Sequence, residues 1–302
     1  GVIKLYNNQV FIADNIKEVI PEFLMLLKGI IDCPDLPLNV SRSALQNDGF
    51  VKKISDYITK KVADKLLGMF KVEHEEYEKY WDDISPFIKY GCLKDEKFGE
   101  KMKDAILFKD LNGKYISIKD AVKEEPEKEV LYYVTDEQQQ SQYIKMFKDE
   151  NMNAFILNHN IDQPFITYLE QKFQNVKFQR IDSELTNDFV EETDKEQLKE
   201  NQDTLKDIFS KVLSKENLDV KLEYLKNQNV SSMITLSEEA RRMQDMMKMY
   251  NMNGMGMDFG KDDSGITLVL NANHALVKYV LENKEGENVT LVCRQLFDLA
   301  ML

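Results

Sequence analysis

Val130-Leu-Tyr-Tyr-Val134 is a short run of aliphatic and aromatic residues, which is typical of a buried β-strand. A helical segment over 139–146 follows it, and Ala154-Phe-Ile-Leu157 then repeats the strand pattern. A second helical segment over 164–173 leads to a third strand at 176–178. Strands that alternate with helices are typical of an α/β unit, so this stretch predicts one.

The part of the chain before this unit divides in two. Apolar and polar residues alternate over 3–6 and 10–12, which predicts two short strands, and the spacing over 16–27 predicts a helix. The prolines of Cys33-Pro-Asp-Leu-Pro37 end regular structure in a loop. From about 47 to 110 the apolar spacing is helical, which predicts a helical connector.

After the unit the sequence turns acidic and loses its apolar periodicity between Asp182 and Asn201. A domain boundary is expected there. The remaining elements that the pattern predicts are a helix around 205–213, strands near 220–224 and 266–270, and helices that begin at Ser237, Asn273 and about Asn288. The expected fold class is therefore α/β followed by a smaller α+β domain.

The composition excludes several classes of protein. With 43% apolar residues among 302, the chain is too apolar to be disordered. Its net charge of −13 gives a field that repels nucleic acid and anionic membranes, so we expect neither as a partner. Three cysteines far apart in sequence indicate neither a zinc site nor a disulfide framework.

The sequence also carries signs of where the protein resides. It has no apolar run of about 18 residues and no signal peptide, so it predicts a cytoplasmic protein. A strand pattern follows Gly1 at once, without an initiator Met. We therefore expect a piece of a longer protein.

The common catalytic signatures are absent from the sequence. It holds no GxxxxGK(S/T), HExxH, CxxC or GxSxG pattern. His74, His159 and His274 each stand alone, and a surface or capping role is the better interpretation of each. A hydrolase that uses Asp162 with His159 is a weak alternative because no nucleophile pattern lies beside them. We expect no metal site.

The loop from Asp35 to Asn47 holds one arginine in an unusual position. Asn39 or Ser41 is suited to cap a helix start, which places Arg42 in a first turn where the helix dipole disfavours a cation. Such an arginine is either held by an ion pair or left to meet a phosphate or carboxylate from outside. From the residues alone, the ion pair is the simpler interpretation.

A resemblance to a known family favours the second interpretation. Leu36-Pro-Leu-Asn-Val-Ser-Arg42, followed by Leu45-Gln46, resembles the middle-domain motif of the ninety-kilodalton heat-shock chaperones, in particular their bacterial HtpG-type branch. The likeness covers essentially the whole chain. Further matches are Val10-Phe-Ile12, Pro21-Glu-Phe-Leu24, Lys28-Gly-Ile-Ile-Asp32, Trp81, Ile161-Asp162, Thr235 to Met247, and Leu268-Val-Leu-Asn-Ala-Asn-His274.

The resemblance implies an ATP-dependent molecular chaperone of the heat-shock response, which binds and remodels unfolded or partly folded client proteins as a dimeric clamp. In that family ATP and Mg bind a domain that precedes the part matched here. We therefore expect no cofactor bound to this chain and no ATP hydrolysis by the chain alone.

The resemblance also implies roles for three residues of the loop. The family arginine that matches Arg42 reaches the γ-phosphate, where a guanidinium neutralises charge on the transferred group. Positions that match Asn39 and Gln46 support the loop, and all three are predicted as catalytic. Ser43 departs from the Glu of many members, so a local salt bridge to Arg42 is not expected from the family pattern.

The same resemblance predicts four segments. Residues 1–46 are the end of the large middle-domain α/β unit with the catalytic loop, and 47–110 form the helical connector. Residues 111–190 form the small middle-domain α/β unit. Residues 191–302 form the C-terminal dimerisation and client-binding domain, whose last helix is expected to follow Leu302.

Half of the 14 methionines lie between Met243 and Met257. Methionine side chains are flexible and polarisable, so they repack against many apolar partners. Periodicity alone favours an ordinary core stripe, but the resemblance implies an amphipathic helix exposed toward a cleft. We predict that Thr235-Leu-Ser-Glu238 caps this helix. The predicted client-binding residues on it are Met243, Met246, Met247 and Tyr250.

Phe165 is a further candidate for client binding. It matches a position at which HtpG relatives carry an aromatic residue near the junction of the middle and C-terminal domains. A place in the ordinary core at a helix start is an equally good interpretation.

The final helical segment carries an almost wholly apolar stripe that includes Val289, Val292, Leu296 and Leu299. Such a stripe either closes the core of its own domain or packs against a second subunit. The resemblance implies a C-terminal four-helix bundle, so we predict that these residues mediate a homodimer.

One other function stays open. A non-catalytic protein-interaction scaffold would use the acidic surface and the methionine-rich helix without a nucleotide cycle. The two functions differ in whether the longer reading frame encodes an ATP-binding domain before Gly1.

Overall fold

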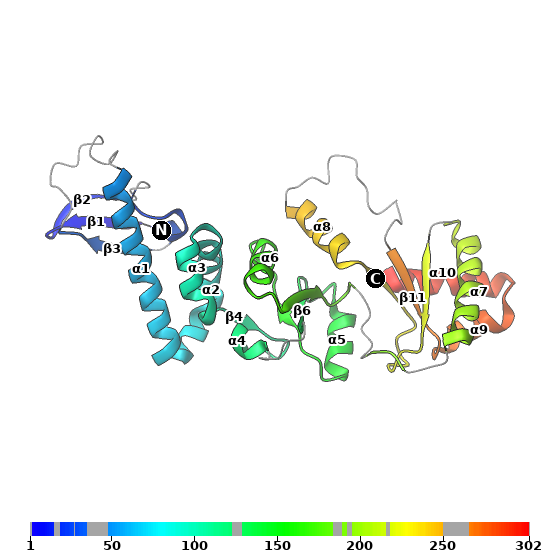
Figure 1. Ribbon diagram of the computed structural model, residues 1–302. Coiled ribbons are helices and arrows are strands. Elements are labelled where there is room, and N and C mark those ends of the chain that lie inside the picture. The colour runs from blue at the N-terminus through cyan, green and yellow to red at the C-terminus, as the bar shows by residue number, and fades with distance from the viewer. Residues whose placement is uncertain are drawn as a thin grey trace. The chain divides into compact units, whose positions relative to one another are not determined.

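The computed structural model describes residues 2–14, 19–26, 28–34, 48–122, 129–183, 189–191, 195–215, 218–249 and 266–301 (Figure 1). By its internal contacts the chain forms two compact units. Unit 1 comprises residues 1–109, 113–129 and 164–175, and unit 2 comprises 110–112, 130–163 and 176–302. The predicted mixture of α/β and α+β structure is confirmed. The four predicted domain segments stay a prediction.

Unit 1 begins with a three-stranded sheet in the order β2-β1-β3. Strand β1 (Ile3–Asn7) pairs antiparallel with β2 (Val10–Asp14) and parallel with β3 (Gly29–Asp32). Asn8 and Gln9 both take positive φ, as a tight hairpin turn requires, and so the two predicted strands are confirmed. Where a helix was predicted over 16–27, the described residues hold only the short 3₁₀ helix η1 (Glu22–Leu26), and β3 was not predicted.

Three helices follow in unit 1, as predicted for the connector. They are α1 (Asp48–Val72), α2 (His74–Lys94) and α3 (Glu96–Met102). The predicted apolar stripe of α1 is buried at Ile54, Ile58 and Leu66. The rest of unit 1 contains η2 (Lys103–Ala105), the hairpin β4 (Leu107–Lys109) and β5 (Tyr115–Ser117), α4 (Ile118–Ala121), and most of α6 (Asp162–Lys172).

Unit 2 contains the sheet of the predicted α/β unit, in the order β7-β6-β8. Strand β6 (Glu129–Val134) lies in the centre, parallel to β7 (Phe155–Ile156), and β8 (Val176–Arg180) lies on its other side. Helix α5 (Ser141–Asp149) connects the first two strands. From the central strand β6 the chain therefore passes to β7 on one side and then to β8 on the other side. Such a switch in strand order opens a crevice at the carboxyl ends of parallel strands.

A second sheet in unit 2 has the order β10-β11-β9. Its central strand β11 (Ile266–Asn271) runs parallel to β9 (Asp219–Glu223) and antiparallel to β10 (Ser232–Leu236). The helices α7 (Lys195–Leu213), α9 (Ala275–Asn283) and α10 (Glu287–Met301) pack against it (Figure 1). Helix α8 (Glu238–Met249) follows β10 directly.

The second sheet is buried on both faces. Leu268 and Leu270 of β11 belong to the core beneath α7, α9 and α10, whereas Val269 between them belongs to a core shared with Phe147 of α5. All five residues of β10 are buried, including Ser232, whose hydroxyl donates a 2.6 Å hydrogen bond to the carbonyl of Leu296. A strand covered on both sides lacks the alternation that reveals strands in a sequence, which explains why β10 was not predicted.

Candidate functional site

Helix α8 carries the predicted methionines, and its first residues fix where it starts. The Ser237 hydroxyl accepts a hydrogen bond of 3.2 Å from the main-chain N–H of Ala240. The cap is therefore Ser237, and the predicted capping box beginning at Thr235 is wrong because Thr235 belongs to strand β10.

Glu238, the first residue of α8, is buried and joins the helix to the α/β sheet of unit 2. Its carboxylate accepts hydrogen bonds from the Tyr133 hydroxyl of β6 at 2.8 Å and from the main-chain N–H of Arg180 at 2.7 Å. It also accepts one from Nε of Arg242, one helical turn later, at 2.8 Å. Burial and the nearby Glu238 carboxylate raise the pKa of Tyr133, so its hydroxyl keeps the proton that it donates.

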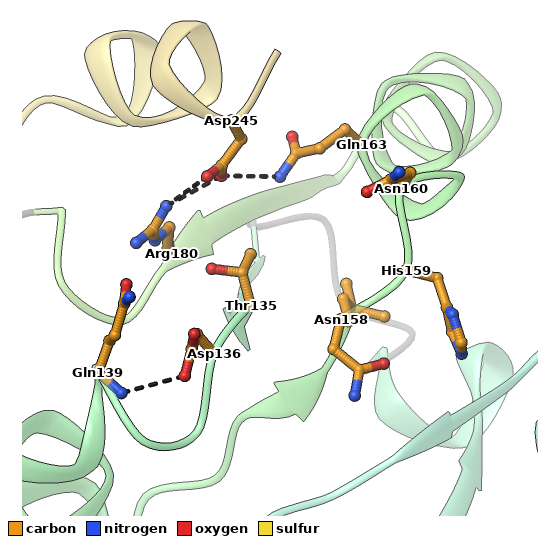
Figure 2. A pocket seen from close by; sticks show the side chains of 10 residues that line it. Thr135, Asp136, Gln139, Asn158, His159, Asn160, Gln163, Arg180 and Asp245 are labelled. Carbon is orange, nitrogen blue, oxygen red and sulfur yellow. Dashed lines mark hydrogen bonds and ion pairs between the residues drawn. The ribbon is translucent and has the colours of Figure 1, made fainter. Parts of the chain in front are cut away.

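Arg180, the last residue of β8, lies at the centre of the contact with α8. Its side chain is 6% exposed, and NH1 donates to both oxygens of Asp245 on α8 at 2.9 Å. Its Nε lies 2.8 Å from Asp182. Figure 2 shows that Gln163 also donates to Asp245, at 3.1 Å. Burial by itself lowers the pKa of Arg180, but Asp182 and Asp245 outweigh it, so the pKa lies above its usual value.

Two further arginines of α8 complete the contact. Arg242 donates to the carbonyl of Phe178 at 2.9 Å, and Arg241 donates to the carbonyl of Asp182 at 3.2 Å. Burial lowers the pKa of Arg241, yet an arginine stays charged at physiological pH. Three guanidinium groups thus face three carboxylates, those of Asp182, Glu238 and Asp245. We call these six residues the charge cluster.

A neighbouring face of α8 carries the exposed methionines. Met243 is 47% exposed and Met246 is 49% exposed, and Glu239 is exposed beside them. We call Met243 and Met246 the methionine face. Met247 belongs to the same helix, and Tyr250 lies outside the described residues. Met243 and Met246 are therefore not core residues, and client binding by the four predicted residues stays a prediction.

A polar cavity of about 290 Å³ opens beside the charge cluster (Figure 2). It lies at the carboxyl ends of β6, β7 and β8, where the switch in strand order predicts a crevice. Gln140 shapes its wall because its side-chain oxygen accepts the main-chain N–H groups of Thr135 and Asp136. The residues that line the cavity are Thr135, Asp136, Gln139, Leu157, Asn158, His159, Asn160, Gln163, Arg180 and Asp245.

The alternative hydrolase pair has no support in this geometry. Asp162 is buried, and its carboxylate accepts the main-chain N–H of His159 at 2.9 Å, which is a turn-forming contact. Within the described ranges, no three His, Cys, Asp or Glu side chains form a group that could hold a metal ion.

Phe165 lies in the core of unit 1. Its side chain is 1% exposed and stacks on Tyr168, with the ring centroids 5.7 Å apart. Such a side chain offers no surface to a client protein in this conformation. The structure therefore corrects the client-contact prediction for Phe165 in favour of the core interpretation.

The predicted dimer residues of α10 separate into two groups. Val289 and Leu296 are buried in the core of unit 2, so they close their own domain and are not available to a second subunit. Val292 is partly buried, and Leu299 is exposed. Leu291 and Met301, which were not among the predicted dimer residues, are exposed as well.

The three residues predicted as catalytic, Asn39, Arg42 and Gln46, lie outside the described residues. The charge cluster was not predicted from the sequence. The sequence of α8 nevertheless indicates a charged helical face. Charged residues recur on that face at three- and four-residue spacing: Glu238, Arg241, Arg242 and Asp245. Nothing in the sequence, however, names Arg180 and Asp182 as their partners.

None of the helices in the described ranges has the length and apolar character that a membrane span requires. The family model described as "Hsp90 protein" matches residues 1–302. The chaperone protein HtpG of Bacteroides thetaiotaomicron is 37% identical over 298 residues, which are 94% of this chain and 43% of that protein. HtpG of Porphyromonas gingivalis is 36% identical with the same coverage, and HtpG of Borrelia garinii is 28% identical over 99% of this chain and 48% of its own length.

The chain thus spans less than half the length of the curated relatives that it matches. The match nevertheless extends from the first residue to the last, across both units. On this evidence the chain belongs to the Hsp90 family.

Proposed function

We propose that this chain is the client-binding and dimerising part of an ATP-dependent chaperone that acts as a cytoplasmic homodimer. The observation that carries the proposal is the methionine face of α8, which exposes two large, flexible apolar side chains on a helix anchored by its charged face. Met243 and Met246 are neighbours at three-residue spacing, and contiguous exposed apolar surface is what marks sites where proteins bind other proteins. An unfolded client offers many different apolar segments, and methionine adapts to each of them.

The nucleotide step belongs to the longer protein in this proposal. ATP with Mg would bind a domain outside this chain, and Arg42 would reach the γ-phosphate with Asn39 and Gln46 supporting its loop. The family membership and the motif around Arg42 support this assignment. The exposed Leu291, Leu299 and Met301 of α10 are the residues that we propose to meet a second subunit.

The proposal is tested with the double variant Met243→Ser, Met246→Ser. Both side chains are about half exposed, so the free energy of unfolding should change by less than about 1 kcal/mol. Binding of fluorescently labelled, reduced and carboxymethylated α-lactalbumin, a permanently unfolded probe, should weaken by at least about fivefold, as measured by anisotropy.

The matched control is Glu239→Ser, which changes an exposed residue on the same side of α8 without removing apolar surface. It should leave binding unchanged. Native α-lactalbumin distinguishes a chaperone from a protein-interaction scaffold, because a chaperone should bind the unfolded probe more tightly than the native protein. Equal binding by the double variant and the unchanged chain would contradict the proposal, and a large loss of stability would place the methionines in the core.

A further inference from the structure

The face of helix α8 that packs on the sheet is charged, unlike that of an ordinary surface helix. In a surface helix the apolar stripe faces the protein and the charged side chains face water. In α8 the charged residues Glu238, Arg241, Arg242 and Asp245 face the sheet, whereas Met243 and Met246 on the neighbouring face are about half exposed. Burial of apolar surface by the methionine face is therefore not what holds the helix in this rotation.

The charge cluster is what holds α8 on the sheet instead. Its ion pairs are largely removed from water, so salt screens them less than it screens surface pairs. Removal of one partner would leave buried charges uncompensated, and this makes the contact costly to break. The cluster is also balanced, with three cations and three anions, as a buried network must be to remain charged.

Among the residues of the charge cluster that lie outside α8, Arg180 is the one that binds two residues of this helix far apart along it. Its main-chain N–H binds Glu238, and its guanidinium binds Asp245 seven residues later. Seven residues are almost two helical turns, or about 10 Å at a rise of 1.5 Å per residue. Two attachment points on one face of a helix fix both its seat and its rotation about the axis.

We propose that Arg180 is a positioning residue of the methionine face: its two contacts hold α8 on the sheet in the rotation that keeps Met243 and Met246 in solvent. What that surface binds rests on the proposed function. The position and rotation of the helix do not rest on the proposed function. The positioning role of Arg180 and the binding role of the methionine face can therefore fail independently of each other.

The test compares Arg180→Met with the unchanged chain by hydrogen exchange and mass spectrometry. The variant should exchange its amide hydrogens over 238–246 at least about tenfold faster, because Asp245 loses the NH1 group that donates to both of its oxygens and Asp182 loses its balancing charge. The amides of strand β10 should keep their protection. Lys177→Met is the matched control, since it removes an exposed cation from the same strand and should change nothing.

Three further measurements separate positioning from a general structural effect. Arg180→Lys keeps the charge but loses the two-pronged contact, so its exchange rate should fall between the two extremes. Asp245→Asn removes the carboxylate from the helix side and serves if Arg180→Met does not fold. Arg180→Met should also bind the unfolded probe more weakly than the unchanged chain, although both methionines remain.

Unchanged exchange over 238–246 in a folded Arg180→Met or Asp245→Asn variant would overturn the inference. Faster exchange together with unaltered probe binding would retain Arg180 as the anchor of α8 but overturn its link to the methionine face. If Met243→Ser, Met246→Ser binds normally while the exchange result holds, the proposed function fails and the anchor remains.

Discussion

Two arginines illustrate how differently one side chain is used in this chain. Arg180 is enclosed by Asp182 and Asp245, and its donors are directed inward to hold a helix. In the proposed function Arg42 has the opposite task, to meet a phosphate brought by another domain. The sequence already separates the two, because Asp182 lies two residues after Arg180 whereas the nearest acidic residue to Arg42 is Asp48.

The role of Arg42 is tested in the longer protein that carries the nucleotide domain. Arg42→Ala should lower the turnover of ATP by at least about a thousandfold if the guanidinium stabilises the transferred phosphoryl group, as arginine fingers do. Binding of ATP should change little, because the contact forms late in the reaction. Steady-state hydrolysis measures the turnover, and nucleotide titration measures the binding of ATP. The control is Arg294→Ala, which changes an exposed residue of α10. Turnover at the unaltered rate would refute the role.

Cys293 offers a prediction about pH. Burial raises the pKa of its thiol from 9.0 to about 11, and only the thiolate reacts with iodoacetamide. At pH 8 the folded chain should therefore present about a hundredfold less thiolate at Cys293 than the chain unfolded in urea. The rate should keep rising until about pH 11.

Mass spectrometry after timed alkylation measures this difference. The sign follows from the direction of the shift: in the folded state the thiol keeps its proton to higher pH, so the contribution to stability is complete below pH 9.0 and is lost as the pH rises toward 11. Cys33, which is partly exposed, should react earlier than Cys293. Equal rates for Cys293 in the folded and unfolded chain would contradict its burial.

At the scale of elements, two glycines within helices of unit 1 have opposite surroundings. A Cβ atom at Gly91 of α2 would lie 2.7 Å from the rings of both Phe23 and Phe98, whereas one at Gly68 of α1 would meet nothing within 4 Å. The absence of a side chain is thus a packing requirement at the first position and only an entropic cost at the second.

Gly91→Ala should therefore lower the free energy of unfolding by about 1–3 kcal/mol through overpacking. Gly68→Ala should raise it by about 0.5–1 kcal/mol, because alanine is the better helix former. Trp81 is the only tryptophan and is buried in α2, so its fluorescence in urea reports on unit 1. A stabilising Gly91→Ala would show that η1 and α3 do not pack closely on α2.

The elements that could be predicted are those with a regular apolar period. The hairpin β1–β2, the connector helices and the β6–α5–β7–α6–β8 order all follow from local pattern. Strand β10 could not be predicted in this way, because it is buried on both faces and carries Ser232 and Thr235 in its core positions. Strand β3 could not be predicted because it is a run of four residues, Gly29–Asp32, that are mostly exposed and carry no apolar alternation.

The candidate site was predictable only in part. The methionines were found because seven lie close together in the sequence, and the resemblance reversed what periodicity alone favoured. The inward charged face of α8 depends on partners at Tyr133, Phe178, Arg180 and Asp182, which come from other elements. No local pattern encodes contacts of such sequence separation.

At the scale of the whole molecule, unit 2 carries each part of the site that the structure describes. The charge cluster, the methionine face, the polar cavity and the exposed residues of α10 all belong to it. Unit 1 carries the position of Arg42. The proposed division of labour places client binding and dimerisation in one unit and the contact to the nucleotide in the other.

Site-specific photo-crosslinking detects whether clients bind the methionine face. A benzoylphenylalanine placed at Met243 or Met246 of this chain should crosslink to reduced and carboxymethylated α-lactalbumin on irradiation. The same residue at Gln228, an exposed position elsewhere in unit 2, should give little product. Equal crosslinking at Gln228 and at the two methionines would contradict the claim.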